Sequence, residues 1–300
     1  MSSTVLIGVD WGSSNLRAFR FDAQGKVLET RHAAHGVTRF PAGEATAAML
    51  AGLRDWLEDC PGVPLLLCGM AGSKLGWREA PYLPAPVDLT ALSLGLVCFE
   101  AEQRQVAIIP GVSSFQEAAG FRDVMRGEET QALGLDEPVP LLIAPGTHSK
   151  WIRLEGATIT GLHTAMTGEL YAVLRQHSLI AGVTRDGDWD AAAFRDGLDN
   201  AYAHPDWLTQ LFGVRARGVL GDMPPSSLAA WLSGLLIGYE LAQGLAQYPD
   251  LQHVAIVASA PLSDYYASAL NSRGIQSQLI DGDHAVMQGL WRIAKEAKLA

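Results

Sequence analysis

The chain has 300 residues, of which 48% are hydrophobic and 18% charged, and its formal net charge is −10. This composition is that of a folded globular protein and excludes a disordered or fibrous one. The negative charge argues against non-specific nucleic-acid binding, which depends on clustered Lys and Arg. The length is sufficient for two domains, each with a core of its own.

The cysteines of the chain are Cys60, Cys68 and Cys98. They have no C-x-x-C spacing, which favours a reducing, cytoplasmic location. The first apolar run has no cationic lead and ends at Asp10, so we expect a strand there and not a secretory signal. The long apolar stretch at residues 228–239 is shorter than the ~20 residues of a bilayer span, and its Gly234 and Gly238 favour close helix packing. We therefore expect no membrane partner, while a homo-oligomer is compatible with the sequence.

In chain order, residues 5–22 (VLIGVDWGSSNLRAFRFD) are typical of a strand, a Gly/Ser turn and a second strand. A turn then leads to a third strand at 27–32, which predicts an antiparallel meander. Residues 44–58 have apolar side chains at helical spacing. Short apolar runs at 63–68 and 106–109 predict buried strands.

The second half repeats this order, with strands near 141–144, 150–154 and 158–164 before a helix that begins after Thr167. We then expect helices near 190–202 and 226–246, a strand at 253–257, a helix at 263–271, a strand at 275–280 and a last helix at 285–297. The repetition predicts an α/β fold of two lobes related by duplication, with mixed sheets and flanking helices. We expect the boundary near Asp136, between lobes 1–136 and 137–300.

The turn of the first hairpin has the residue types of a phosphate site. Glycine lets the backbone approach a phosphate closely, and main-chain N–H groups and hydroxyls donate to its oxygens. A carboxylate at the strand end can hold Mg²⁺ through water, which makes Asp10 the metal candidate. The alternative is a plain β-hairpin. The turn candidates are Gly12, Ser13, Ser14 and Asn15, with Arg17 returning on the second strand.

A similar hairpin recurs at residues 141–154 (LLIAPGTHSKWIRL), where Gly146 and Thr147 can present N–H and hydroxyl donors to a terminal phosphate. Lys150 on the following strand points either at the nucleotide or into solvent. His148 is either a ligand contact or a packed turn residue, and we assign it no catalytic role. Two such hairpins together predict a two-lobed phosphate clamp.

The segment MRGEETQALG places Glu128 and Glu129 at the start of a helix that we expect at an interlobe cleft. One first-turn glutamate is explained by the helix dipole alone. The functional interpretation is that one carboxylate accepts the proton of a substrate hydroxyl as it attacks the terminal phosphate. We prefer Glu128 as the base and keep Glu129 in reserve, while Asp10 is a competing candidate.

The long Gly/Pro-rich loop at 69–86 follows a buried strand, a usual place for ligand contacts. Its GMAGSK misses the spacing of a phosphate loop, and no protein-kinase motif set is present. An arginine offers bidentate geometry to the carboxylate of an acid substrate, although an isolated surface cation is often only solvated. The substrate-binding candidates are Thr38, Arg39, Ser73, Lys74, Trp77 and Tyr82, with Arg78 in the same loop.

Together these motifs resemble those of the acetate and sugar kinase, actin and heat-shock ATPase superfamily, and more narrowly those of the 2-dehydro-3-deoxygalactonokinase family. The narrow resemblance runs through IGVDWGSSNLRAFRFD, HGVTRFPAG, CGMAGSKLGWREAPYLPAP, IIPGV, VMRGEETQALG, APGTHSKWI, TAMTGELYAVLRQHSLI and VASAPLSDYYASAL. It implies two ribonuclease-H-like lobes and Mg²⁺-dependent use of ATP. The implied reaction is phosphorylation of 2-dehydro-3-deoxy-D-galactonate on its 6-hydroxyl, a step in galactonate breakdown.

Sugar kinases of the superfamily are similar in their first loop, which has Asp, Gly, two hydroxyl residues and Arg. They also have a Gly-Asp pair that opens a helix, with the aspartate as base, where this chain has Gly127-Glu128 and a second glutamate. The resemblance implies that Asp10 holds the hydrated metal, that Ser13, Ser14 and Thr147 bind phosphates, and that Arg17 stabilises the developing charge.

An adenosine-binding segment of this superfamily follows a strand in the second lobe, and residues 258–262 (ASAPL) are similar to it. Ser259 and Ala260 are therefore cofactor-binding candidates. The alternative is that the segment is a simple strand-to-helix turn, which favours the same residue types. In the last helix, Gly289 would allow a close crossing back to the first lobe. The alternative to a kinase is a nucleotide-dependent switch ATPase without a small-molecule acceptor, or a kinase for a related sugar acid.

Overall fold

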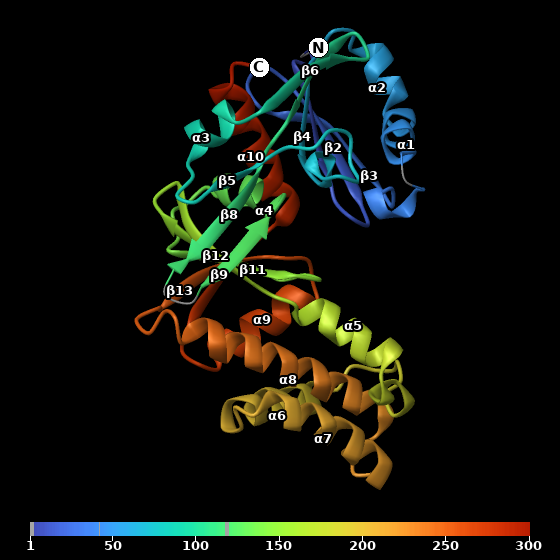
Figure 1. Cartoon of the computed structure of the whole chain (residues 1–300), viewed down its shortest axis with the longest axis vertical. Helices are drawn as coiled ribbons and strands as arrows, with labels where there is room; N and C mark the ends of the chain where they lie inside the picture. The colour runs from blue at the N-terminus through green and yellow to red at the C-terminus, as the bar shows by residue number, and fades with distance from the viewer. Residues whose placement is uncertain (1–2, 42, 118–119) are drawn as a thin grey trace. The chain divides into compact units, whose positions relative to one another are not determined.

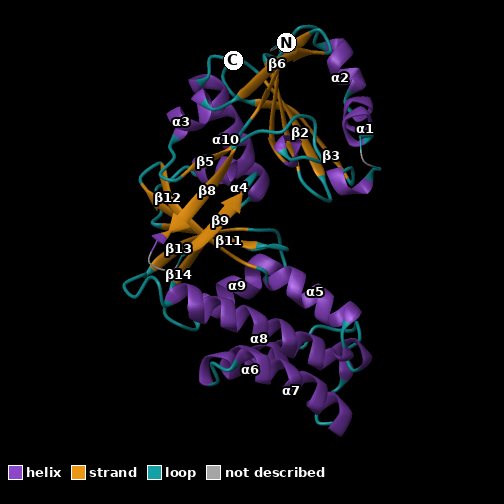
Figure 2. Cartoon of the chain, viewed as in Figure 1, coloured by secondary structure: helices purple, strands orange, loops and turns teal. Residues whose placement is uncertain are grey.

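A computed structural model describes residues 3–41, 43–117 and 120–300. Figures 1 and 2 show a mixed α/β chain. It divides into two compact units, each assembled from separate stretches. The first unit contains Met1–Leu142, Ile152–His163 and Ile280–Ala300, and the second contains Ile143–Trp151 and Thr164–Leu279. The single lobe boundary expected near Asp136 stays a prediction.

The first sheet contains the expected meander. Its strand order is β3-β2-β1-β4-β7-β6. β1 pairs antiparallel with β2, which pairs antiparallel with β3, and β1 also pairs in parallel with β4. The two inner strands β1 and β4 are almost wholly buried, as their apolar runs predict. The strands are β1 Leu6–Trp11, β2 Leu16–Phe21, β3 Val27–Ala33, β4 Leu65–Gly69, β6 Val97–Ala101 and β7 Arg104–Ile108.

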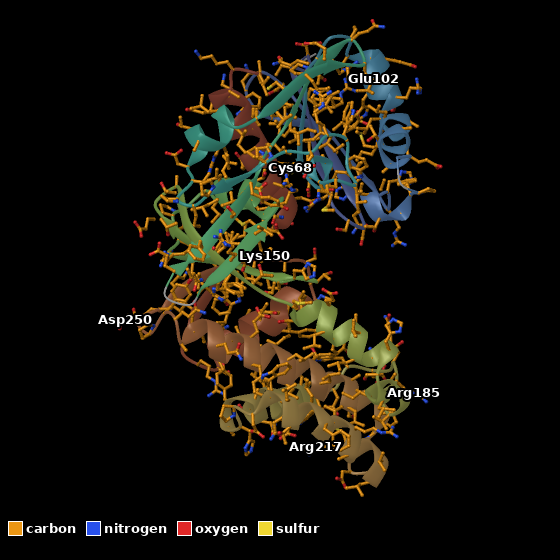
Figure 3. All side chains as sticks on the ribbon, in the orientation of Figure 1. Cys68, Glu102, Lys150, Arg185, Arg217 and Asp250 are labelled. Atoms are coloured by element: carbon orange, nitrogen blue, oxygen red, sulfur yellow. The ribbon has the colours of Figure 1, made fainter. Side chains whose placement is uncertain are left out.

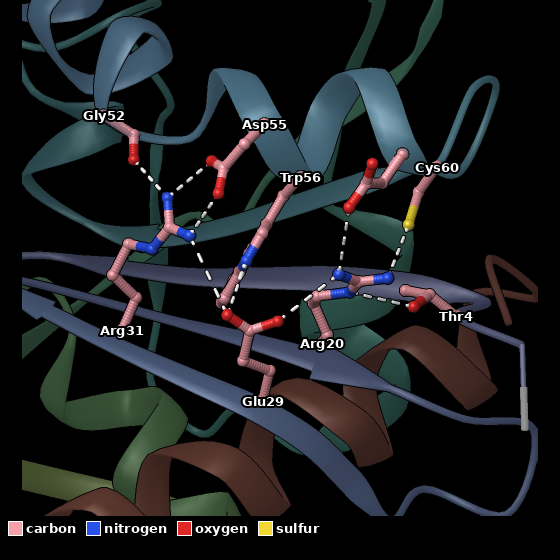
Figure 4. A network of polar contacts seen from close by, with 9 residues as sticks. Thr4, Arg20, Glu29, Arg31, Gly52, Asp55, Trp56 and Cys60 are labelled. Atoms are coloured by element: carbon pink, nitrogen blue, oxygen red, sulfur yellow. Dashed lines mark hydrogen bonds and ion pairs between the residues drawn. The ribbon is translucent and has the colours of Figure 1, made fainter. Parts of the chain in front are cut away.

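The helix expected at 44–58 is two helices, α1 Ala45–Gly52 and α2 Arg54–Asp59. Between them, Leu53 leaves helical geometry with φ −114° and ψ 4° while its side chain stays fully buried. A polar network fixes α2 over the sheet (Figure 4): Glu29 accepts a hydrogen bond from the Trp56 indole at 3.0 Å, and Arg31 pairs with Asp55 at 2.7 Å. The change of direction lets both helices bury apolar side chains on the same core.

A small sheet in the order β5-β8-β9 was not predicted. Its strands are β5 Tyr82–Pro84, β8 Gly111–Gln116 and β9 Phe121–Met125. β5 is only three residues long, and both faces of β9 are largely exposed, so neither strand has the apolar alternation of a half-buried strand. The first unit also contains helix α3 Leu89–Leu94, capped by Asp88, and the short 3-10 helices η1 Val37–Arg39 and η2 Met70–Gly72.

The second large sheet has the order β12-β11-β10-β13-β14, which repeats the order β3-β2-β1-β4 of the first and supports duplication. The repeat confirms the mixed-sheet α/β fold. The strands lie close to the expected ranges: β10 Leu141–Ala144, β11 Ser149–Glu155, β12 Thr158–Ala165, β13 His253–Val257 and β14 Gln276–Ile280.

The helices of the second unit are α5 Thr167–His177, α6 Ala191–Ala203, α7 Trp207–Leu220, α8 Pro225–Leu245 and α9 Leu262–Asn271, with η4 Leu179–Gly182. The close packing expected at Gly234 and Gly238 is confirmed. A Cβ on Gly234 would lie 1.9 Å from the carbonyl oxygen of Phe194 on α6. Helix α7 was not predicted. None of the helices in the described residues has the length and apolar character needed to cross a bilayer.

In the first unit, α4 Glu128–Leu133 and the last helix α10 Gly282–Glu296 cross at glycines. A Cβ on Gly289 would lie 1.9 Å from the carbonyl oxygen of Thr130, and one on Gly134 would lie 1.8 Å from that of Ala285. The close crossing expected at Gly289 is therefore present. It fixes α4, which begins with the two glutamates, against α10.

Candidate active site

The first hairpin turn is an exposed loop that is hydrogen-bonded to a second segment, which contains Thr38. Within the turn, the Gly12 N–H donates to the carbonyl of Asn15 at 2.9 Å, and Ser13, Ser14 and Asn15 are exposed. The Thr38 hydroxyl and N–H both donate to the carbonyl of Ser13, at 2.8 and 3.1 Å. The structure thus brings Thr38 and the neighbouring Arg39 beside the predicted phosphate turn.

Asp10, at the end of β1, is held by an arginine. Arg17 donates from Nε to Asp10 Oδ2 at 2.9 Å and from Nη2 to the same oxygen, and its Nη1 makes an ion pair with Asp283 on α10 at 2.7 Å. Burial alone would lower the pKa of Arg17, but the charges of Asp10 and Asp283 outweigh it and raise the pKa. His32 lies 3.2 Å from the second oxygen of Asp283. The guanidinium is therefore fully charged and occupied on two sides by carboxylates.

The other oxygen of Asp10 faces Cys68 on β4 (Figure 3), whose Sγ donates to Oδ1 across 3.5 Å. Burial raises the pKa of Cys68, and the negative charges of Asp10 and Glu129 raise it further. The thiol is thus neutral near neutral pH and acts as a weak donor. Because both oxygens of Asp10 already have protein partners, Asp10 is suited to contact a metal ion through a bound water molecule.

Two glycines place the start of α4 next to Asp10. Gly69 has φ +72°, and a Cβ there would lie 3.3 Å from Asp10 Oδ1. Gly127 has φ +117°, and a Cβ there would lie 3.3 Å from the Cα of Gly69. Both backbones adopt conformations that favour glycine, so the chain can pass close to the strand end. The Gly127-Glu128 pair and Asp10 belong to one neighbourhood of the first unit.

The two glutamates at the start of α4 have different environments. Glu129 is fully buried; it accepts hydrogen bonds from the Gly127 N–H at 2.6 Å and from the Thr130 hydroxyl at 3.0 Å. Burial, with the charge of Glu128 second, raises the pKa of Glu129 to about 7. Glu128 is only half-buried, and its carboxylate accepts from the Arg126 N–H at 3.2 Å. Only Glu128 of the pair is accessible to a ligand.

Arg126 is a residue that sequence reasoning passed over. Its guanidinium lies 4.2 Å over the ring of Tyr82 and donates to the carbonyl of Ala80 at 2.8 Å. Its second terminal nitrogen, Nη1, is buried without a hydrogen-bond partner, and a Cβ on Gly72 would lie 2.5 Å from it. No carboxylate of the described residues forms an ion pair with Arg126. The signal in the sequence is its position directly before Gly127-Glu128.

The remaining substrate candidates lie in or after η2. The Ser73 hydroxyl donates to the carbonyl of Met70 at 2.8 Å, and Lys74 is exposed. Trp77 packs edge-on against Phe99 with ring centroids 5.3 Å apart, and the Arg78 guanidinium lies over the Phe99 ring. Core packing therefore explains Trp77, whereas Tyr82 is exposed beside Arg126.

The turn of the second hairpin belongs to the second unit. Thr147 and His148 are exposed in its turn, and the Thr147 carbonyl accepts from the Glu169 N–H at 2.9 Å. His148 lies 2.5 Å from the carboxylate of Glu169, so this histidine packs on α5. Gly168 at the start of α5 lies so close that its Cβ would meet the carbonyl oxygen of Gly146 at 2.3 Å. The turn and the start of α5 form one substructure.

Lys150 (Figure 3) is 6% exposed, which excludes the alternative of a solvated side chain. Its neighbours Ser149 and Trp151 both reach Glu240 on α8. Because successive side chains of a strand alternate between faces, Lys150 points to the opposite side of β11. The nucleotide contact considered for Lys150 stays a prediction.

An apolar cavity of about 240 Å³ lies in the second unit beside the hairpin. Trp189 and Tyr265 in its wall are stacked at 4.1 Å between ring centroids. Pro261 and Leu262 line it, whereas Ser259 and Ala260 in the same segment do not. The other wall residues are Gly146, Thr167, Gly168, Tyr171, Ser233, Leu236, Ile237 and Tyr266. A flat aromatic ring is the kind of ligand that such walls bind.

No cluster of three or more His, Cys, Asp or Glu side chains suited to a metal occurs in the described part of the chain. Mg²⁺ usually keeps several waters and binds through one or two carboxylates together with substrate phosphates. Asp10, with Arg17 and Cys68 on its oxygens, fits a hydrated ion of that kind.

Comparisons with known proteins show the family of the chain. A family model described as 2-keto-3-deoxy-galactonokinase matches residues 10–293. The 2-dehydro-3-deoxygalactonokinase of Escherichia coli (strain K12) is 38% identical over 292 residues, covering 96% of this chain and 97% of that protein. A crystal structure of a Sinorhizobium meliloti protein described as a 2-dehydro-3-deoxygalactonokinase superposes with a TM-score of 0.88 at 34% identity, covering 97% of this chain and 98% of the other.

A more distant structure shows the fold alone. It is the activator of 2-hydroxyisocaproyl-CoA dehydratase from Clostridium difficile, solved with bound ADPNP. Its identity is 9%, its TM-score is 0.51, and the match covers 98% of this chain and 96% of the other. The duplicated α/β fold expected from the sequence is confirmed by this likeness.

Proposed function

Because the chain belongs to the 2-keto-3-deoxy-galactonokinase family, we propose that it transfers the γ-phosphate of ATP to the 6-hydroxyl of 2-dehydro-3-deoxy-D-galactonate. The observation that carries this proposal is the family match over residues 10–293, which includes Asp10, the turns of both hairpins and the Gly127-Glu128 pair. The free cysteines of the chain support a reducing, cytoplasmic setting.

Adenine is proposed to occupy the cavity lined by Trp189 and Tyr265, because its apolar aromatic walls suit a planar heterocycle. Gly146 lines this cavity and Thr147 beside it is exposed, so the N–H groups and hydroxyl of this turn are suited to phosphate oxygens. In the first unit, Ser13 and Ser14 offer donors of the same kind. Mg²⁺, when bound with ATP, supplies neutralisation of phosphate charge, and Asp10 would hold its waters.

Glu128 is proposed as the base that accepts the proton of the 6-hydroxyl. Its accessible carboxylate lies in the same neighbourhood as Asp10. Glu129 is less suited because it is fully buried and already accepts two hydrogen bonds. Asp10 is less suited because both of its oxygens already have protein partners, Oδ2 the Arg17 guanidinium and Oδ1 the Cys68 thiol.

The pairing of Arg17 with two carboxylates favours a positioning role: it orients Asp10 and neutralises its charge. A cation is still required for the carboxylate of the sugar acid. Arg126 suits this role because it has no carboxylate partner among the described residues, is only partly buried beside the exposed Tyr82, and lies two positions before the proposed base. Tyr82, Thr38 and Arg39 remain candidates for the substrate hydroxyls.

ADP release measured with and without a panel of sugar acids tests the proposal. We expect ADP release to depend strongly on 2-dehydro-3-deoxy-D-galactonate, with the gluconate epimer as the closest competitor. Strong dependence on a different acid would assign another substrate of the same class. Hydrolysis at the same rate without any acceptor would instead support a nucleotide-dependent switch ATPase.

A further inference from the structure

Helix α8 contains a buried carboxylate in an otherwise apolar stretch. Glu240 is 7% exposed, while its neighbours Leu235, Leu236, Ile237 and Leu241 are buried apolar residues. A charged group without partners in such a setting would be strongly destabilising. The carboxylate must therefore be stabilised by hydrogen bonds.

Four side chains from three other elements donate to this carboxylate. The Ser149 hydroxyl and the Trp151 indole N–H donate to Oε1 at 2.6 and 2.8 Å. The Tyr266 hydroxyl donates to Oε2 at 2.5 Å, and the Thr167 hydroxyl donates to the same oxygen. Burial raises the pKa of Glu240, and these donors oppose the rise. Four donors on two oxygens fill the accepting capacity of a carboxylate.

Each donor belongs to an element that borders the proposed nucleotide site. Ser149 and Trp151 begin β11 directly after the hairpin turn, and Thr167 is the first residue of α5. Thr167 and Tyr266 also line the aromatic cavity. Glu240 itself does not line the cavity. It therefore connects the hairpin, α5 and α9 from behind the cavity wall.

We propose that Glu240 is a positioning residue for the nucleotide: it holds the phosphate hairpin and the cavity wall in fixed register, so that adenine and the phosphates are bound by one rigid substructure. The proposal rests on the proposed placement of ATP in the second unit. A rigid site loses less conformational entropy when the ligand binds. Loss of the carboxylate should therefore weaken nucleotide binding although Glu240 does not contact the nucleotide.

Two substitutions test the proposal. In Glu240→Met the four donors lose their acceptor, and we expect the Kd for ADP to rise about tenfold or more. In Glu240→Gln the amide oxygen can accept from Ser149 and Trp151, while the amide N–H groups face hydroxyls of Thr167 and Tyr266, which can also accept. We expect Glu240→Gln to retain ADP affinity within about threefold of the unsubstituted protein.

Tyr239→Phe is the matched control, because Tyr239 precedes Glu240 on the same helix and its hydroxyl donates at 2.6 Å to the carbonyl of His204, away from the cavity. The measurements are isothermal titration with ADP, steady-state KM for ATP against kcat, and Tm. We expect both Glu240→Met and Tyr239→Phe to lower Tm, but only Glu240→Met to raise the Kd for ADP and the KM for ATP.

A Glu240→Met protein with lower Tm but unchanged Kd and KM would overturn the proposal and leave Glu240 a residue of the core alone. If Glu240→Met does not fold, Tyr266→Phe replaces it as the test, because it removes one hydrogen-bond donor to Glu240 at the cavity wall. Unchanged ADP affinity in Tyr266→Phe would overturn the proposal in the same way. If ATP does not bind in this cavity, Trp189→Ala will leave the Kd for ADP unchanged. This result distinguishes failure of the ATP placement from failure of the proposal about Glu240.

Discussion

Replacing Glu129 with glutamine should make the protein less sensitive to alkaline pH. The carboxyl is fully buried, and its pKa is raised to about 7 from 4.5. Between these two pH values the native state keeps a proton that the unfolded chain has released. Stability therefore falls as pH rises through this interval, and above pH ~7 the native state carries the full cost of a buried, ionised carboxylate.

The magnitude follows from the two pKa values. The difference corresponds to about 3 kcal/mol when Glu129 is ionised in both states, of which about 2 to 3 kcal/mol develops between pH 5 and pH 8. The glutamine of the variant can keep both hydrogen bonds, because its amide oxygen accepts from the Gly127 N–H and its amide N–H can donate to the Thr130 hydroxyl. The variant should therefore gain stability relative to the unsubstituted protein as pH rises.

The assay is urea unfolding of both proteins at several pH values from 5 to 8, with the difference in free energy of unfolding plotted against pH. Glu128→Gln is an internal check, since removing the neighbouring charge should lower the pKa of Glu129 and reduce the pH dependence. Parallel stability curves for the Glu129→Gln variant and the unsubstituted protein would refute this reasoning.

Glu128→Gln should lower kcat about 100-fold or more while ADP affinity changes less than twofold; near-normal turnover would remove Glu128 as the base. Arg126→Met should raise the KM for the sugar acid about tenfold or more and leave the KM for ATP unchanged, whereas Arg122→Met on the preceding strand β9 serves as control and should alter neither. An unaltered sugar-acid KM in Arg126→Met would reject that assignment. Gly289→Ala should destabilise the fold by about 3 kcal/mol, because its Cβ would lie 1.9 Å from the carbonyl oxygen of Thr130; an unchanged urea midpoint would show that the crossing is looser.

Local sequence patterns predicted the hairpins, the helix start at Glu128 and most strands of both large sheets. Each of these features depends on apolar alternation and turn residues within a short segment. The strand order in the two sheets also agreed with the repetition seen in the sequence. The break at Leu53 and the helix α7 were not predicted, because the burial of Leu53 and the packing of α7 depend on residues far away in the chain.

The aromatic cavity could not be found from the sequence. Trp189 lies before α6 and Tyr265 lies on α9, and no local pattern relates two residues so far apart. The same holds for the partners of Glu240, although one acid in an apolar helix is itself a signal of a buried polar network. Arg126 was visible in the motif, but only the coordinates show its unpaired nitrogen.

Identification of the reaction product by phosphorus NMR tests the central assignment most directly. With 2-dehydro-3-deoxy-D-galactonate and Mg-ATP, we expect one phosphorylated product, formed in equal amount to ADP, whose phosphorus signal is split by the protons on C6. ADP formation at the same rate without the sugar acid, or a phosphoryl group on another oxygen, would contradict the account.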